Sequence, residues 1–370
     1  MRKYLARIPA KLPRSTEELI RWYERYISPL SLIVGFTLDN IILRRVDQLR
    51  SNALLFFYFV VASLCILAFH MIKSGRLRGK VFLAIVPYIP VAIQFAFGGL
   101  FSGYLVLYLH SAAYATSWVF VAILAGLLVG NERFRRLYEN FAFQGSMLFL
   151  ALMSFWIFFL PVLTGKIGTI EFLISEAIAV GITFVFIRAF ALLAPDVFRV
   201  SKWRLRQSIA SIFLIFNVLY FTNAIPPLPL ALKEAGVYHS VKKIGDVYQV
   251  KAEPLLWYQK YLNYNTTYHL APGERVYVFT AIFAPTNLST TIIHNWEHYD
   301  ETTGKWVVIN SVAFVISGGR GEGYRGYTIL DNTLPGKWRV NVQTGNKLIG
   351  RVAFTIEKVA QPVQTNTEDH

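Results

Sequence analysis

Cysteine is nearly absent from this 370-residue chain, which contains only Cys65. A single thiol can form neither an intrachain disulfide nor a cysteine-based zinc site or redox pair. The first 26 residues lack an apolar core followed by a small-residue cleavage site, so we expect no cleavable signal peptide. Charged residues are also scarce, at 16% of the chain against 54% hydrophobic residues. This balance lies outside the usual range of soluble proteins and indicates a membrane protein.

Acidic residues are few, and the resulting basic excess belongs to one part of the chain. Residues 1–225 contain 23 Lys and Arg against 10 Asp and Glu, a net charge of +13. Residues 226–370 contain 14 against 12, a net charge of +2, so that the whole chain carries +15. Cytoplasmic loops of membrane proteins are rich in Lys and Arg, which explains this distribution more simply than nucleic-acid binding does. We therefore expect no nucleic-acid partner.

Seven apolar stretches lie between Ile27 and Phe221. A helix needs roughly 20 mostly apolar residues to cross a bilayer, so we expect an α-helical transmembrane domain over residues 27–224. The spans are predicted near residues 27–43, 52–72, 81–100, 111–130, 142–164, 170–194 and 207–224. The third and fourth spans are hard to separate, because residues 81–130 contain no Asp, Glu, Lys or Arg. A break is expected at 97–103, and residues 101–110 are either re-entrant or begin a long fourth helix.

The charged loops predict an orientation. Basic residues gather at 73–80, 133–136 and 199–206, which places these connections in the cytoplasm. Residues 1–26 are expected to be a basic cytoplasmic segment, and the C-terminal domain is then periplasmic. Arg44, Arg45 and Arg50 disagree, because this topology puts them outside after a short first span.

After the last apolar stretch the pattern changes to that of a β-domain. Residues 225–272 begin with a proline-rich run and are interpreted as a juxtamembrane linker, with an aromatic-rich helix suggested at 253–263. Alternating β-branched and aromatic segments follow at 275–283, 291–299, 306–316, 324–330, 337–343 and 348–356. Their length and spacing predict an antiparallel sandwich of the immunoglobulin or fibronectin kind over 273–359. Trp306, Trp338 and Arg339 are interpreted as core and strand residues, and the polar residues 360–370 as disordered.

Four stretches carry a resemblance to a known group of proteins. They are the run from Phe221 to Ser240, which includes Ile-Pro-Pro-Leu-Pro-Leu, then Phe279–Pro285, Gly318–Thr328, and Gly336–Val340 followed by Gly350-Arg351. With these stretches the chain resembles an uncharacterised family of bacterial polytopic inner-membrane proteins whose C-terminal part is a domain of unknown function. The resemblance implies an inner-membrane protein with an extracytoplasmic β-sandwich. It implies no activity.

The run His294–His298 holds two histidines in one of the predicted strands. Alternate residues of a strand share a face, so the imidazoles would lie on either side of Trp296. Two histidines can bind zinc, but a site needs further ligands, and nothing in the sequence places any nearby. We therefore expect cross-strand packing and predict no metal or other cofactor. His294 and Trp296 remain candidate neighbours of a ligand surface.

The glycine-rich run Gly318–Tyr327 is the main candidate for such a surface. It contains Arg320, Tyr324, Arg325 and Tyr327. Arginine beside tyrosine suits the recognition of carboxylates, phosphates or sugar hydroxyls. The alternative, which is favoured about two to one even though loops often carry function, is a glycine-rich hairpin whose arginines bind neighbouring carbonyls.

Ionisable residues inside the predicted spans form the second candidate site. A charge near the centre of a bilayer costs about 2.5–3.5 kcal/mol on insertion scales, so Asp39, His110, Glu176 and Arg188 need a reason to be there. They form either a polar path or lipid-headgroup site, or polar contacts between helices, and the second interpretation is favoured.

Two functional hypotheses follow. The first is a non-enzymatic envelope protein whose sandwich binds a glycan, a peptidoglycan fragment or a protein, while the helices anchor it in the lipid bilayer and relay the event. The second is a transporter or lipid-modifying enzyme whose site lies among the helices, with the sandwich as an accessory. The sequence contains no recognisable catalytic triad, carboxylate pair or metal motif, so the first hypothesis is favoured.

Overall fold

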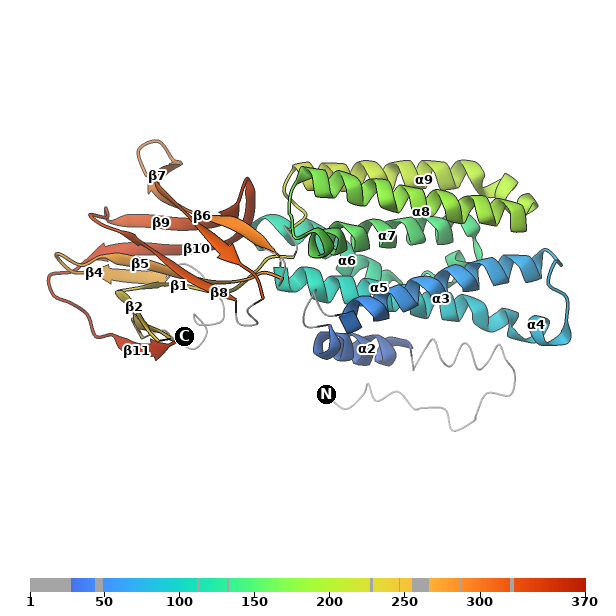
Figure 1. The fold of residues 1–370 in the computed structure, drawn as a ribbon, viewed down its shortest axis with the longest axis horizontal. Coiled ribbons are helices and arrows are strands. Elements are labelled where there is room, and N and C mark those ends of the chain that lie inside the picture. The colour runs from blue at the N-terminus through green and yellow to red at the C-terminus, as the bar shows by residue number, and fades with distance from the viewer. Residues whose placement is uncertain are drawn as a thin grey trace, which may run out of the picture.

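A computed structural model describes residues 28–43, 49–111, 114–131, 133–226, 229–245, 247–254, 266–285, 288–319 and 323–370. The chain forms a helical part followed by a β-part, and the two lie end to end along the long axis of the molecule (Figure 1). The predicted basic segment 1–26 lies outside the described residues, as does nearly all of the helix suggested at 253–263.

All seven apolar stretches form helices where the structure describes them, and two of these helices continue through residues that usually disfavour a helix, such as Gly98, Gly99 and Pro161. The helices are α2 (Ser28–Ile42), α3 (Leu49–Lys73), α4 (Lys80–Ile85), α5 (Ile89–Ser111), α6 (Tyr114–Asn131), α7 (Phe141–Thr164), α8 (Thr169–Leu193) and α9 (Pro195–Phe221). Two short 3-10 helices lie between them: η2 (Val86–Tyr88) between α4 and α5, and η3 (Arg135–Glu139) between α6 and α7.

Only four segments of the described chain are long and apolar enough to cross a membrane, fewer than the seven predicted. They are Arg50–Lys73, Lys80–Leu109, Phe141–Thr164 and Thr169–Leu193. Helix α2 has 15 residues, and the described apolar part of α6 is Trp118–Asn131. Helix α9 has 27 residues, but its first half is polar and carries four basic side chains. Apolar composition thus overcounted the spans, because it ignored helix length and the position of charge.

Helix α5 also corrects the expected break at 97–103, since it continues through the glycines to Ser111. A Cβ on Gly99 would lie 2.5 Å from the Tyr58 ring of α3, and one on Gly103 would lie 2.7 Å from Leu55. These glycines therefore allow α3 to pack closely against α5, and they do not end the helix.

The connections after α3, α6 and α8 lie together at the end of the helical part that is farthest from the β-part (Figure 1). Residues 199–206, predicted to form a connection, instead belong to the first half of α9. The Lys73 Nζ lies 2.9 Å from Glu139 Oε2, which joins the connection after α3 to η3. Arg76 Nη1 donates to the Leu192 carbonyl at 2.7 Å, which joins the same connection to the end of α8. The helical part is therefore polarised along its length, with a strongly basic end.

The β-part begins at Ala231 and contains strands in three sheets. Its strands are β1 (Ala231–Tyr238), β2 (Ser240–Ile244), β3 (Val247–Ala252), β4 (Thr266–Leu270), β5 (Val276–Phe283), β6 (Ser289–Asp300), β7 (Lys305–Ser317), β8 (Tyr324–Leu330), β9 (Gly336–Thr344), β10 (Lys347–Lys358) and β11 (Asn366–Asp369). The sheet orders are β1-β5-β8, β4-β10-β9-β6-β7 and β11-β3-β2. The six predicted strands correspond to β5–β10, with ends that agree to within two residues.

The first two sheets pack face to face on a shared core. Val278 of β5 and Trp296, Trp338 and Phe354 of the five-stranded sheet are buried there together. The β11-β3-β2 sheet, which we call the accessory sheet, adds a smaller layer, with Val241 and Val250 in the same apolar cluster as Phe279 of β5. Alternation of apolar residues along the strands is what creates these layers.

Two predicted boundaries are corrected. Residues 225–272 do not form a linker, because β1 to β4 all lie within them. The tail 360–370, expected to be disordered, contains β11, which pairs with β3 from Asn366 to Asp369. Polar strands such as β11 are held mainly by backbone hydrogen bonds, so their composition gave no signal.

Candidate functional site

His294 and Trp296, predicted to border a ligand surface, are fully buried between the two main sheets. The His294 ring lies between two hydroxyls, with Nε2 3.2 Å from Thr280 Oγ1 and Nδ1 3.0 Å from Thr328 Oγ1. Trp296 Nε1 also donates to Thr328 Oγ1, at 3.1 Å. Burial lowers the pKa of His294 to about 4. Both residues are therefore neutral parts of the core, and this correction removes them from the candidate surface.

The glycine-rich candidate does not form a single surface either. Arg320 lies outside the described residues. Tyr324 packs against the inner core, whereas Arg325 and Tyr327 alternate with it and point the other way on β8. The Tyr327 ring, 38% exposed, lies 6.3 Å from the ring of Tyr248 in the accessory sheet. The glycines have a structural role: a Cβ on Gly318 would meet the Pro285 carbonyl oxygen at 1.6 Å.

A different set of polar residues gathers on the outer face of the five-stranded sheet. Strand register places Ser311, Asn295, Asn341 and Arg351 in one row across β7, β6, β9 and β10. Glu297 and Arg339 face each other in the next row. We call the face formed by these six residues and Gln343 the polar face. It lies on the side of the sheet opposite the buried tryptophans, because its members alternate with them along the strands.

One half of the polar face is a chain of hydrogen bonds centred on a buried amide. Arg351 Nε donates to Asn341 Oδ1 at 2.6 Å, and Asn341 Nδ2 donates to Glu297 Oε1 at 2.8 Å. Arg339 Nε donates to the other carboxylate oxygen of Glu297 at 2.5 Å. Asn341 is 4% exposed and Glu297 is 9% exposed. The charged groups therefore hold one another in fixed positions, as charge-assisted hydrogen bonds do.

The other half is formed by neutral side chains. Ser311 Oγ donates to Asn295 Oδ1 at 2.6 Å, and Asn295 Nδ2 donates to Gln343 Oε1 at 2.9 Å. The polar face is thus bonded across four adjacent strands, which keeps its donors and acceptors in place.

Aromatic side chains border the polar face near the β6–β7 turn. The guanidinium carbon of Arg339 lies 4.2 Å from the centre of the Trp306 ring, a cation–π distance. Tyr299, opposite Trp306 in the register, has its ring 5.2 Å away, and Lys337 Nζ lies 5.6 Å from the Tyr299 ring. Arg339 and Trp306 were interpreted only as core and strand residues. The alternating polar residues of β6, β9 and β10 were a signal in the sequence for the polar face. The sequence did not show which of them lie side by side, because this depends on the register between strands.

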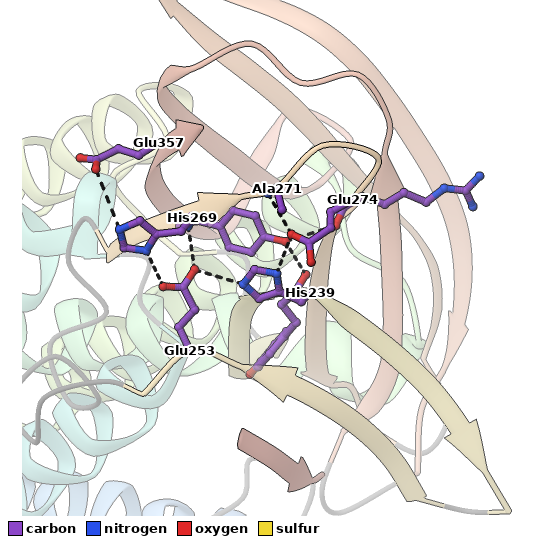
Figure 2. A network of polar contacts seen from close by, with 9 residues as sticks. His239, Glu253, His269, Ala271, Glu274 and Glu357 are labelled. Carbon is purple, nitrogen blue, oxygen red and sulfur yellow. Dashed lines mark hydrogen bonds and ion pairs between the residues drawn. The ribbon is translucent and has the colours of Figure 1, made fainter. Parts of the chain in front are cut away.

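A second polar cluster lies at the end of the β-part that is far from the helices (Figure 2). Glu253, at the end of β3, has one oxygen 3.1 Å from His239 Nε2 and the other 2.7 Å from His269 Nδ1. His239 Nδ1 is 3.4 Å from Glu274, and His269 Nε2 is 3.9 Å from Glu357.

The imidazoles and carboxylates of this cluster contact one another and, within the part of the chain that the structure describes, leave no shared centre for an ion. Among the described residues, no group of three or more His, Cys, Asp or Glu is placed to bind a metal ion. Burial raises the pKa of the Glu253 carboxyl, but hydrogen bonds from His239 and His269 outweigh it, so that the pKa is lowered overall. The cluster therefore connects the accessory sheet to β4 and β10 electrostatically.

The ionisable residues of the helices lie at separate interfaces. Asp39 of α2 accepts a short hydrogen bond from Ser102 of α5. Glu176 of α8 accepts from Asn217 Nδ2 of α9 at 2.7 Å. The guanidinium of Arg188 lies 5.6 Å from the ring of Phe184 on its own helix. Of His110 the structure describes only the backbone, in α5. The described contacts are pairwise contacts within or between helices, and they bring none of these residues together.

Fold and site together define a helical protein with four candidate membrane spans and a C-terminal β-part that carries a fixed polar face. A family profile described as "Protein of unknown function (DUF2914)" matches residues 289–356. This region runs from the first residue of β6 into β10, and it includes every residue of the polar face. The match agrees with the resemblance to a family with a C-terminal domain of unknown function, and it is restricted to the β-part.

Comparisons with other proteins add little. No curated protein matches the chain. A solved structure of the Pseudomonas fluorescens alkylpurine DNA glycosylase AlkC, bound to DNA containing an abasic site analog, covers 92% of this chain and 85% of that chain at 13% identity. Its TM-score of 0.19 is too low to indicate a shared fold, so the likeness carries no functional argument.

Proposed function

We propose that the chain is a non-enzymatic membrane protein of the bacterial envelope whose β-part binds a ligand or partner through the polar face. The observation that supports this most is the burial of Glu297 and Asn341 in a bonded network on the outside of a sheet. A solvent-facing sheet surface does not need such a network for stability, whereas a recognition surface benefits from side chains held in position.

The topology is part of the proposal. The basic end of the helical part faces the cytoplasm, and the β-part at the other end faces the periplasm. The clustering of the basic connections at one end supports this orientation, because Lys and Arg are retained on the cytoplasmic side. The helices serve as the anchor in the bilayer of the inner membrane.

Hydroxyl-radical footprinting of the full-length protein in nanodiscs tests the proposal. A muramidase digest of peptidoglycan and a periplasmic protein extract serve as two separate probes. We expect one of them to protect Trp306 and Tyr299 from labelling, while Tyr248 in the accessory sheet keeps its labelling rate. Equal labelling of all three residues with and without both probes would overturn the proposal.

A further inference from the structure

We propose that the ligand of the polar face is a saccharide chain that carries carboxylate groups, and that Arg339 and Arg351 bind these carboxylates. This inference rests on the proposed function and names its ligand class.

The two arginines are oriented before any ligand arrives. Each uses its Nε–H inside the network, Arg339 toward Glu297 at 2.5 Å and Arg351 toward Asn341 at 2.6 Å. A guanidinium has five N–H donors in a planar fork, so the Nη groups remain as donors at the end of a fixed side chain. Planar, fixed guanidinium groups suit carboxylates, because two parallel hydrogen bonds can form without further loss of side-chain freedom.

The charge of this region favours an anion. Arg339 and Arg351 lie close to the carboxylate of Glu297, whose two oxygens already accept hydrogen bonds from Arg339 and Asn341. Lys337 adds a positive charge at the border of the face, over the ring of Tyr299. Burial and then the positive charge of Arg339 lower the pKa of Arg351, while the negative charge of Glu297 opposes this shift. Two like charges in one network repel each other. A bound anion would relieve this repulsion. Glu357 lies farther along β10, beside His269.

The remaining groups favour a saccharide over a protein. Asn295, Gln343 and Ser311 supply amides and a hydroxyl, which match sugar hydroxyl groups. Four adjacent strands span roughly 14 Å from β7 to β10, enough for a short chain of sugars to lie across them. Protein interfaces usually have an apolar centre, whereas the centre of this face is formed by Glu297 and Asn341.

Binding measurements on the full-length protein in nanodiscs of zwitterionic lipid test the inference. The probe is a galacturonic acid oligosaccharide of defined length, and its matched control is the same oligosaccharide with methyl-esterified carboxylates. A hexaglutamate peptide tests an acidic protein as the alternative class. We expect the acidic oligosaccharide to bind, with affinity at least about tenfold weaker after esterification.

Three variants locate the site. Arg351→Met and the double variant Glu297→Gln/Arg339→Met each remove a binding guanidinium, and the double variant leaves no unpaired carboxylate. Each is expected to weaken binding at least about tenfold. Lys242→Ala removes one charge from an exposed position of β2 and should leave the affinity unchanged. Thermal unfolding of each variant shows whether it is folded.

The outcomes separate this inference from the proposed function. Three outcomes would overturn the inference that the ligand is an acidic saccharide. The esterified control could bind as tightly as the acidic oligosaccharide, hexaglutamate could bind equally or more tightly, or the acidic oligosaccharide could fail to bind. Protection of Trp306 in the footprinting experiment would still support the polar face as a binding site. Loss of binding that is equal in Lys242→Ala and Arg351→Met would show that overall charge, and not the polar face, attracts the ligand.

Discussion

At the scale of the single residue, burial of the His294 ring makes the stability of the β-part depend on pH. Its pKa of about 4 in the folded protein lies below the ordinary value of 6.5 because the ring is buried. Between these two pH values the unfolded chain binds a proton that the folded chain does not. The contribution of His294 to stability is therefore complete above about pH 6.5 and is lost as the pH falls toward 4, by about 3 kcal/mol in total.

The pH dependence can be measured with His294→Gln, which keeps polar contacts to Thr280 and Thr328 but does not titrate. We expect the free energy of unfolding of the wild-type β-part to decrease by about 2 kcal/mol more than that of the variant between about pH 6.5 and pH 5. Urea unfolding followed by tryptophan fluorescence at both pH values gives this difference. Equal pH dependence in the two proteins would show that His294 is not the titrating group.

Arg339 and Glu297 form a partly buried ion pair, in which each charge is compensated by the other. Their side chains are 21% and 12% exposed, so removal of the arginine alone leaves a poorly solvated carboxylate. We expect Arg339→Met to lower the free energy of unfolding by about 2–3 kcal/mol. The double variant Glu297→Gln/Arg339→Met should recover more than half of this loss, as measured by chemical denaturation. A double variant as unstable as the single one would show that packing of Arg339 on Trp306, and not charge, provides the stability.

At the scale of elements, the accessory sheet is fixed by histidine–carboxylate contacts at its far end. Glu253 accepts from both His239 and His269, and the His269 amide donates to it at 2.7 Å. The lowered pKa of Glu253 means that its contribution is present above the ordinary pKa of 4.5 and is lost as the pH falls through the lower, folded value.

The variant Glu253→Gln tests whether this contact fixes the accessory sheet. It removes the charge and weakens three hydrogen bonds, with an expected loss of about 2 kcal/mol. Hydrogen–deuterium exchange near neutral pH should become faster in β2, β3 and β4, while β6 and β9 keep their protection. Glu357→Gln is the matched control, because Glu357 is 61% exposed and 3.9 Å from His269. Unchanged exchange in β2 and β3 would mean that the apolar contacts of Val241 and Val250 suffice.

The strands differ in how visible they are from sequence. β6 to β10 alternate apolar and polar residues over 7 to 13 positions, and their periodicity identifies them. β5 is a nearly continuous apolar run of eight residues, which is also typical of a buried strand. β2, with Lys242 and Lys243, and β11 have few apolar residues, so only long-range pairing defines them. The polar face was missed for the same reason: Asn341 and Arg351 meet only through the register of β9 and β10. Local patterns contain no information on register.

At the scale of the whole molecule, the division into a helical part and a β-part follows from hydropathy alone. The number of spans does not, because Arg199, Lys202, Arg204 and Arg206 occupy the first half of α9 and α2 is short. Loop charges predicted that residues 73–80, 133–136 and 199–206 share one side of the membrane. The contacts of Lys73 with Glu139 and of Arg76 with Leu192 bring the connection after α3 together with η3 and with the end of α8. Which side of a membrane this end faces remains a prediction.

The junction between the two parts determines how the polar face is held relative to the membrane. Lys347, at the start of β10, has its Nζ 3.4 Å from the centre of the Tyr220 ring near the end of α9. Ile167, between α7 and α8, packs against the apolar cluster of the β-part that includes Leu230. A cation over an aromatic ring in a partly buried place contributes up to about 2 kcal/mol, so Lys347 should limit the movement of the β-part.

We therefore expect Lys347→Met to broaden the distribution of distances between the two parts. Spin labels at residues 74 and 242, introduced into a Cys65→Ala background, report this distance by pulsed electron paramagnetic resonance in nanodiscs. Lys358→Met, at the other end of β10, removes an exposed lysine far from the junction and should leave the distribution unchanged. A distribution equally narrow in Lys347→Met would show that the apolar contacts of Ile167 hold the junction. In that case the polar face has a fixed position over the bilayer that is independent of the Lys347 charge.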